Sequence, residues 1–176
     1  MTTTKWAIDP THSEIGFKVK HMMFTNVSGK FTKFDATVTT QGDDFDTALF
    51  EFSGEIDSID TGNTDRDGHL KSADFFDAEK FPALTFTSTS FDKQSDGEYT
   101  LTGDLTLHGV TKQVTLDVEF GGTAKDPWGN LKAGFSATGK VNRKDWGLTW
   151  NAALETGGIM LGEDVKLAIE LQFVKQ

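Results

Sequence analysis

Strict alternation of apolar and polar residues is the feature of this sequence that most limits its fold. In the segment 14–21, the apolar residues Ile15, Phe17 and Val19 alternate with glutamate, glycine and lysine residues. A period of two predicts a β-strand with one face in water and the other in an apolar interior. The next inward position after Val19 is His21, so the apolar face ends in an ionisable ring. We expect the rest of the chain to close a barrel around this face.

Seven further segments show the same alternation and are predicted to be strands, separated by turns rich in Gly, Asp, Asn or Pro. Their approximate bounds are 27–39, 50–56, 84–91, 99–107, 113–120, 131–141 and 165–173. In the first of them the apolar parity changes, because Phe31 is in phase with Val27 whereas Phe34 is not. This change predicts a β-bulge near Thr32 or Lys33.

The segment 61–82 has a different period. Leu70, Ala73 and Phe76 recur at spacings of three, which predicts one short helix, and Pro82 is expected to end it. The helix is thus inserted between the third and fourth strands of an all-β chain. Eight antiparallel strands joined mostly by short turns favour an up-and-down barrel over a sandwich. With 176 residues, the chain is expected to form one domain, 1–176.

Large side chains could fill this barrel or line a cavity inside it. Fifteen Phe and four Trp residues concentrate the apolarity of a chain whose mean hydropathy is negative. Small eight-stranded barrels either fill their interior or hold one small ligand, and periodicity does not decide between the two. Because cores are universal and pockets are not, the pattern alone favours a core role. The rings concerned are Phe17, Phe31, Phe34, Phe75, Phe76, Phe86, Phe120 and Phe135.

Charge and composition argue against several classes of function. A net charge of -10 opposes binding to phosphate backbones, so neither nucleic acid nor an anionic membrane surface is an expected partner. The chain has no cysteine, which excludes disulfides, thiolate chemistry and Cys-based zinc sites. The four histidines have no metal-site spacing, so we expect no metal and no cofactor. They are His12, His21, His69 and His108.

The N-terminal sequence has no basic region followed by an apolar one, and no window approaches 18 apolar residues. As written, the chain is expected to be soluble and cytoplasmic, without stable membrane insertion. A periplasmic protein from which a signal peptide had been removed would have the same sequence. The oligomeric state stays open, a homodimer included.

Two polar clusters have both a structural and a functional interpretation. The first, just before the predicted helix, consists of Asp65, Arg66, Asp67 and His69. It is either a helix start whose acidic residues complement the helix dipole, or an acid/base or head-group site. The helix start is favoured, since no Ser or Cys nucleophile motif accompanies the cluster. The second, 142–146, could anchor an anionic head group, although a solvated turn with a locally paired Arg143 is simpler.

Sequence blocks along nearly the whole chain follow one known pattern. They include Trp6-x-Ile8-Asp9-Pro10-x-His12-Ser13, Phe17-x-Val19-x-His21, Arg66-Asp67-x-His69-Leu70, Phe75-Phe76-Asp77, Gly109-Val110-Thr111 and Arg143-x-Asp145-Trp146-Gly147. In this order they resemble the YceI-like family of lipocalin-like polyisoprenoid-binding proteins. The resemblance implies an eight-stranded antiparallel lipocalin-like β-barrel with a helix over it.

The resemblance also implies an apolar tunnel for an isoprenoid or similar long-chain amphiphilic lipid, such as a polyprenyl phosphate, a quinone, or a fatty amide or acid. It implies a protein that binds, sequesters or carries this lipid and is not an enzyme. Strand parity then assigns the tunnel lining, with His21 and Arg143 as candidates to hold the head group. The predicted ligand-binding residues are Phe17, Val19, His21, Phe31, Leu70, Phe75, Phe76, Phe86, Leu105, Phe120, Phe135, Arg143 and Trp146.

Two other functions stay open. The barrel could enclose an enzyme site for an apolar substrate, with Asp67 or His69 as general base and Arg66 stabilising charge. A barrel filled by its own side chains would instead serve as an interaction module alone.

Overall fold

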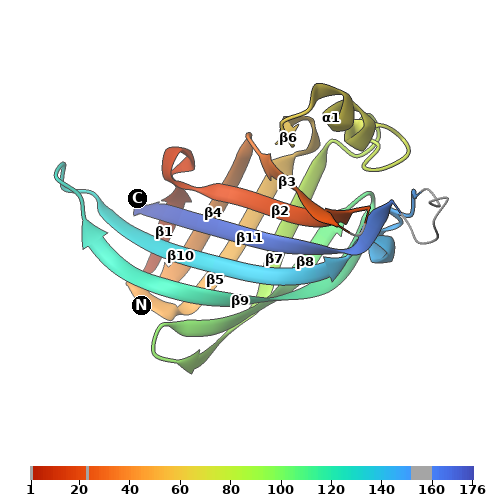
Figure 1. Cartoon of the computed structure of the whole chain (residues 1–176). Helices are drawn as coiled ribbons and strands as arrows, with labels where there is room; N and C mark the ends of the chain where they lie inside the picture. Colours follow the sequence, from red (N-terminus) through yellow and green to blue (C-terminus); the bar gives the residue numbers. More distant parts are fainter. Residues whose placement is uncertain (1, 23, 152–159) are drawn as a thin grey trace.

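The alternating segments form one antiparallel β-barrel, described in the computed structural model for residues 2–22, 24–151 and 160–176 (Figure 1). The strands are β1 (Thr3–Ile8), β2 (Glu14–His21), β3 (Thr25–Phe31), β4 (Phe34–Gln41), β5 (Asp44–Glu55), β6 (Ile59–Asp60), β7 (Ala83–Ser95), β8 (Glu98–Leu107), β9 (Val110–Lys125), β10 (Leu131–Asn142) and β11 (Leu161–Lys175). The helices are α1 (Thr64–Lys71) and the short 3-10 turns η1 (Pro10–His12), η2 (Ile56–Ser58) and η3 (Arg143–Trp146).

These strands occupy eight positions in the barrel wall. In the part of the chain that the structure describes, neighbours pair antiparallel in the order β1-β4-β5-β7-β8-β9-β10-β11, and β1 pairs with β11 to close the ring. β2 continues beyond β1 along the same edge of β11. β3 and β6 likewise continue beyond β4 and β5. The predicted eight-stranded antiparallel barrel with one helix is therefore confirmed.

The chain bends between β3 and β4, at the position predicted to hold a β-bulge. Thr32 and Lys33 lie between two strands, and their backbone groups bond to η2. The Thr32 N–H donates to the Ser58 carbonyl at 3.0 Å, and Ser58 Oγ donates to the Lys33 carbonyl at 3.2 Å. The predicted bulge is wrong, because bonds to a neighbouring turn replace the ladder bonds of a continuous strand.

The helix is shorter than predicted. α1 begins after Asn63, whose Oδ1 accepts a hydrogen bond from a backbone N–H of the first turn, and ends at Lys71. Ser72 has an extended backbone, and its Oγ donates to the His69 carbonyl at 2.5 Å. The predicted continuation to Pro82 is wrong, because Ser72 satisfies the last turn and takes the chain out of the helix.

Buried aromatic rings, among them Trp6 of β1 and Phe173 of β11, form one cluster. The chain termini next to these residues lie at the end of the barrel away from α1 (Figure 1). Phe135 lies at the centre of this aromatic cluster. Its ring centroid is 4.9 Å from that of Phe120, 5.4 Å from that of Phe50 and 5.6 Å from that of Phe45. Trp6 is fully buried and extends the cluster, with its ring 4.8 Å from that of Phe45. This end of the barrel is therefore a packed core.

Two strand glycines provide a matched test of this packing. An added Cβ at Gly103 on β8 would lie 2.4 Å from Phe86 Cζ and 2.6 Å from the Thr87 carbonyl oxygen, whereas at Gly134 on β10 it would meet no described atom within 4 Å. We expect Gly103→Ala to lower the free energy of unfolding by about 1–3 kcal/mol. Gly134→Ala should change it by about 0.5 kcal/mol or less. Urea unfolding checks this, and equal effects would contradict the close approach of Phe86 to β8.

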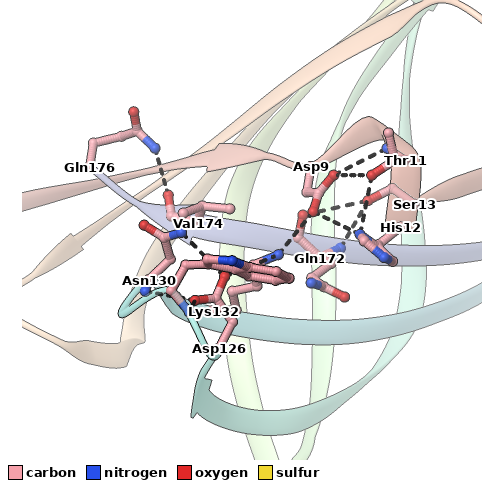
Figure 2. A network of polar contacts seen from close by, with 11 residues as sticks. Asp9, Thr11, His12, Ser13, Asp126, Asn130, Lys132, Gln172, Val174 and Gln176 are labelled. Atoms are coloured by element: carbon pink, nitrogen blue, oxygen red, sulfur yellow. Dashed lines mark hydrogen bonds and ion pairs between the residues drawn. The ribbon is translucent and has the colours of Figure 1, made fainter.

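Asp9 connects η1 to β10 through a network of polar contacts, at the barrel end away from α1 (Figure 2). Its Oδ2 accepts from Lys132 Nζ at 3.1 Å and lies 2.9 Å from His12 Nδ1, and its Oδ1 accepts from Thr11 Oγ1 at 2.7 Å. Lys132 Nζ also lies 3.7 Å from Asp126 Oδ2. The hydrogen bonds from Thr11, then those from His12 and Lys132, hold the pKa of Asp9 well below its ordinary value.

Replacing Asp9 by asparagine is expected to lower the free energy of unfolding by about 1–3 kcal/mol at neutral pH, since the bonds to a charged acceptor are lost. A carboxylate whose pKa is lowered by folding stabilises the protein above the unfolded pKa, which is about 3.9 for Asp. As the pH falls below this value, the wild type loses this contribution and the difference from the variant shrinks. Urea unfolding at neutral and acidic pH measures the difference, and one that did not change with pH would contradict the ionic role.

Candidate functional site

A cavity of about 500 Å³ lies at the other end of the barrel, beneath α1 (Figure 1). Inward-facing residues of β2, β3, β8 and β11 form its wall, and α1 and the turn after it form its cover. The rest of the lining comes from η3, from β7 and β10, and from Thr61, Asn63, Leu148, Trp150 and Met160. Most of the lining is apolar, because the wall consists of the inward positions of alternating strands. The volume falls within the range of small-molecule sites, about 300–1,000 Å³.

Ten of the thirteen predicted ligand-binding residues line this cavity, from six segments of the chain. Their contact with a ligand stays a prediction, but the structure does bring them together around one space. They are Phe17, Val19, His21, Phe31, Leu70, Phe75, Phe76, Leu105, Arg143 and Trp146.

The other three predicted residues lie outside the cavity lining. Phe120 and Phe135 stack in the aromatic cluster, and Phe86 is buried with its ring against Gly103. Their predicted placement therefore needs correction. Parity showed that these side chains point inward, but their height along the barrel axis depends on register and on the residues that they meet across the interior.

Arg143 brings a buried positive charge to the cavity, with only 5% of the residue exposed. Its Nε donates to the Gly162 carbonyl at 2.9 Å, and its Nη1 donates to the carbonyls of Leu148 at 2.6 Å and Trp150 at 2.9 Å. Nη2 is buried without a hydrogen-bond partner among the described residues. Burial lowers the pKa of the Arg143 guanidinium, and the Glu163 carboxylate opposes this shift. An arginine with so high an ordinary pKa stays charged at neutral pH.

The solvated turn predicted for 142–146 is wrong for Arg143. This side chain points into the protein and donates hydrogen bonds to two backbone carbonyls of the segment after η3, which hold that segment in place. Lys144 is the exposed cation of the turn and forms an ion pair with Glu163 at 2.7 Å. Trp146 is also buried, and its Nε1 donates to the Leu105 carbonyl at 3.0 Å. η3 is therefore anchored in the barrel end.

Three rings meet between α1 and the segment after η3. The ring centroid of His69 lies 5.0 Å from that of Phe75 and 4.7 Å from that of Trp150, and the latter two are 5.2 Å apart. His69 Nε2 lies 2.9 Å from Asp74 Oδ2. Since all three rings line the cavity, they connect its cover to its wall.

The polar cluster before the predicted helix holds the turn that precedes α1. Arg66 Nε donates to Thr61 Oγ1 and its Nη2 to the Thr61 carbonyl, both at 2.8 Å. Asp67 Oδ1 accepts from the backbone N–H of Thr61 at 2.9 Å and from its hydroxyl at 2.5 Å. Asp65, Arg66 and His69 line the cavity, whereas Asp67 is not part of the lining. The side chains of Arg66 and Asp67 thus hold Thr61 in place through hydrogen bonds.

Sequence reasoning missed several cavity residues. Val165 and Leu167 are inward positions of β11, and their alternation could have identified them. Leu148 and Trp150 follow η3 in a segment without periodicity, so no pattern indicated them. The shared role of these residues appears only when the barrel is closed.

Neither a metal site nor a membrane-spanning helix is found in the described ranges. Among residues 2–22, 24–151 and 160–176, no group of three or more His, Cys, Asp or Glu residues could hold a metal ion. No helix in these ranges is long and apolar enough to cross a bilayer.

Comparisons with known proteins agree with this architecture. The model of the YceI-like domain matches residues 6–173. The UPF0312 protein SAS2572 of Staphylococcus aureus is 41% identical over 171 residues, which are 97% of each chain. The crystal structure of the Campylobacter jejuni YCEI protein has a TM-score of 0.78, with 34% identity and 96% of each chain covered.

A third structure shows the same fold at lower identity. A polyisoprenoid binding domain from Saccharophagus degradans, described as implicated in plant cell wall breakdown, has a TM-score of 0.66 with 16% identity. The match covers 97% of this chain and 98% of that domain. The family model and the close relatives together establish that the chain belongs to the YceI-like family.

Proposed function

We propose that this protein binds an amphiphilic lipid, with an isoprenoid or similar apolar chain in the cavity beneath α1, and sequesters or carries it. The observation that carries the proposal is an apolar cavity whose lining includes Arg143, a buried cation with one nitrogen that has no hydrogen-bond partner among the described residues. An apolar lining suits a hydrocarbon chain, and a buried guanidinium suits a head group that accepts hydrogen bonds. The polyisoprenoid binding described for the Saccharophagus domain points to the same class of ligand.

The size of the cavity indicates how much chain it can enclose. A water molecule occupies about 30 Å³ of the liquid, and a methylene group is of similar size, so the cavity of about 500 Å³ holds on the order of 15 chain carbons. Each buried CH₂ contributes roughly 0.8 kcal/mol before the costs of ordering the chain. The enclosed part is then about three isoprene units or a fatty chain of similar length.

Arg143 and His21 are the residues that we propose hold the head group. Arg143 Nη2 supplies a charged donor, and His21 ends the inward face of β2 within the cavity lining. Charged donors bind phosphate and carboxylate oxygens more strongly than neutral carbonyls. Polyprenyl phosphates and fatty acids fit this chemistry best, and quinones and fatty amides fit it through their carbonyls.

We propose a structural role and not a catalytic one for the polar cluster beside the cavity. Arg66 and Asp67 are both engaged with Thr61, and His69 with Asp74. The groups considered for an acid/base site thus have structural partners in the described protein. Their geometry is accounted for by a structural role, in which they hold α1 over the cavity.

Mass spectrometry of an organic extract of the purified protein tests the proposal. We expect a stoichiometric isoprenoid, quinone, fatty acid or fatty amide. The delipidated protein is then titrated with farnesol and with farnesyl phosphate, which share one chain and differ in head group. An empty extract together with no binding of either compound would overturn the proposal.

Variants at Arg143 test the head-group assignment. Arg143→Met is expected to bind farnesyl phosphate about tenfold more weakly than the wild type, because a charge-assisted hydrogen bond is lost. Arg143→Lys keeps the charge and should retain part of the preference for phosphate over farnesol. Calorimetric titration of both ligands measures this preference, and its persistence in a folded Arg143→Met variant would contradict the assignment.

A further inference from the structure

Lysine residues form a row on the outer face of three neighbouring strands, near the cavity end of the barrel. Lys18 of β2 pairs with Lys166 of β11, which pairs with Lys140 of β10. Lys20 lies two residues further along β2 on the same face. These four residues, the lysine row, are all exposed. Since directly opposite residues have Cβ atoms about 5 Å apart, their positive charges lie close together.

Folding does not account for the lysine row. Like charges opposite one another destabilise a sheet, and the whole chain has a net charge of -10. Lys140 has a carboxylate nearby, with its Nζ 3.7 Å from Asp164 Oδ2. Lys18, Lys20 and Lys166 form no ion pair with any residue in the described ranges. Three unpaired cations on an acidic protein therefore point to an anionic partner.

Charge is also segregated among the directly paired positions of β2 and β11, whereas Asp164 and Glu163, in the irregular part of β11 before Val165, lie near Lys140 and Lys144. Glu14 pairs with Glu170 in the part of the β2–β11 ladder away from the cavity, whereas Lys18 pairs with Lys166 toward it. An anionic surface would attract one end of this ladder and repel the other. This charge distribution would orient the protein on an anionic partner with its cavity end toward that partner.

An exposed apolar tip adjoins the lysine row, in the hairpin between β2 and β3. Phe24 is 81% exposed and Met22 is 39% exposed. Met22 has a φ of 52°, which residues other than glycine rarely adopt. Its N–H donates to the carbonyl of Met160, a cavity-lining residue, at 2.7 Å. The tip is therefore held beside the cavity with an aromatic ring in water.

We propose that the lysine row and Phe24 dock this protein on an anionic lipid bilayer, with the cavity end toward the membrane. Clustered lysines are attracted to anionic head groups, and an exposed aromatic ring gains by entering the interface. The exposed ring of Phe24 favours a bilayer over an acidic protein surface as the partner. Charge attraction alone would not require an exposed aromatic side chain beside the lysines. The exchange of bound lipid with the membrane rests on the proposed function, whereas the docking itself does not.

This docking departs from the expectation drawn from net charge. Charges act over a Debye length of about 8 Å at physiological salt, so the local cations decide what happens at this face. The exposed acidic residues Asp65 and Asp74 lie on α1 and the turn after it, beyond β3 and β6 from the lysine row.

Vesicle co-sedimentation tests the proposal. The protein is mixed with vesicles of phosphatidylcholine alone and with vesicles in which half of the lipid is phosphatidylglycerol. We expect binding to the anionic vesicles that salt weakens, and about tenfold weaker binding of a Lys18→Glu/Lys166→Glu variant. Phe24→Ser should also weaken it. A Lys5→Glu/Lys125→Glu variant, with the same net charge but changed at exposed positions of β1 and β9, should bind as the wild type does.

Two results would overturn the proposal. One is wild-type protein that binds neither kind of vesicle, which would leave an acidic protein as the partner of the row. The other is a Lys18→Glu/Lys166→Glu variant that binds anionic vesicles as well as the wild type does. Both lysines are exposed and outside the cavity lining, so this variant should fold and take up farnesol normally. If the wild-type protein takes up no farnesol, the proposed function is refuted, whereas the vesicle result still stands on its own.

Discussion

Replacing Phe135 by alanine is expected to lower the free energy of unfolding by about 3–5 kcal/mol, a large part of the stability of a domain of this size. Phe135 is 3% exposed and lies at the centre of the aromatic cluster. Its ring neighbours include Phe45, Phe50 and Phe120, and none of them can move into the vacated space without leaving another contact. The variant therefore creates a cavity in the filled end of the barrel.

Phe17→Ala is the matched control, because it removes the same ring from the hollow end. Phe17 is half-buried and faces the cavity, so part of its ring surface already lacks packing partners. We expect it to cost about 1–2 kcal/mol in the ligand-free protein. Urea unfolding of both variants compares the two ends. A Phe17→Ala variant as unstable as Phe135→Ala would show that the cavity end is packed after all.

Replacing Val19 by tryptophan is expected to abolish most lipid binding, with about a 100-fold loss of affinity for farnesol. Val19 is an inward residue of β2, paired with Val27 on one side and Val165 on the other, and all three line the cavity. The indole ring would project into the space proposed for the chain. Because it enters a cavity and not a packed core, the fold should persist.

The control for this variant places the same ring outside the barrel. Ser28 on β3 is exposed and has the opposite parity to Val27, so Ser28→Trp leaves the interior unchanged. Fluorescence titration of the delipidated proteins with farnesol measures both affinities. Undiminished binding by a folded Val19→Trp variant would place the ligand elsewhere.

The two ends of the barrel divide stability from binding. The aromatic cluster fills one end with buried rings, and β2, β3 and β6 continue the wall at the other end beyond β1, β4 and β5. Side chains around a cavity lack the packing contacts that a filled core would give them. A small domain stays folded despite this loss only if the rest of its core is well packed. Substitutions in the cluster should therefore affect unfolding, and those in the cavity should affect ligand affinity.

Much of the barrel could be predicted from the alternation of residues. Phe17, Val19 and His21 point inward as expected, since side chains of a strand alternate between its faces whatever the strand pairs with. Strand β1 was not predicted, because only Trp6 and Ile8 mark its inward face. The bend at Thr32 and the early end of α1 depend on hydrogen bonds to distant or adjacent groups that no period reveals.

The sequence by itself determined the family, the inward face of most strands and ten residues that the structure places around one cavity. Only the tertiary structure decided that Phe135 fills one end whereas Phe17 lines the cavity, and that Arg143 is buried with one nitrogen that lacks a hydrogen-bond partner among the described residues. It also decided that Lys18 and Lys166 stand side by side. The physical reason is that periodicity records which face a side chain occupies, whereas depth, packing partners and charge neighbours depend on the register between strands far apart in the chain.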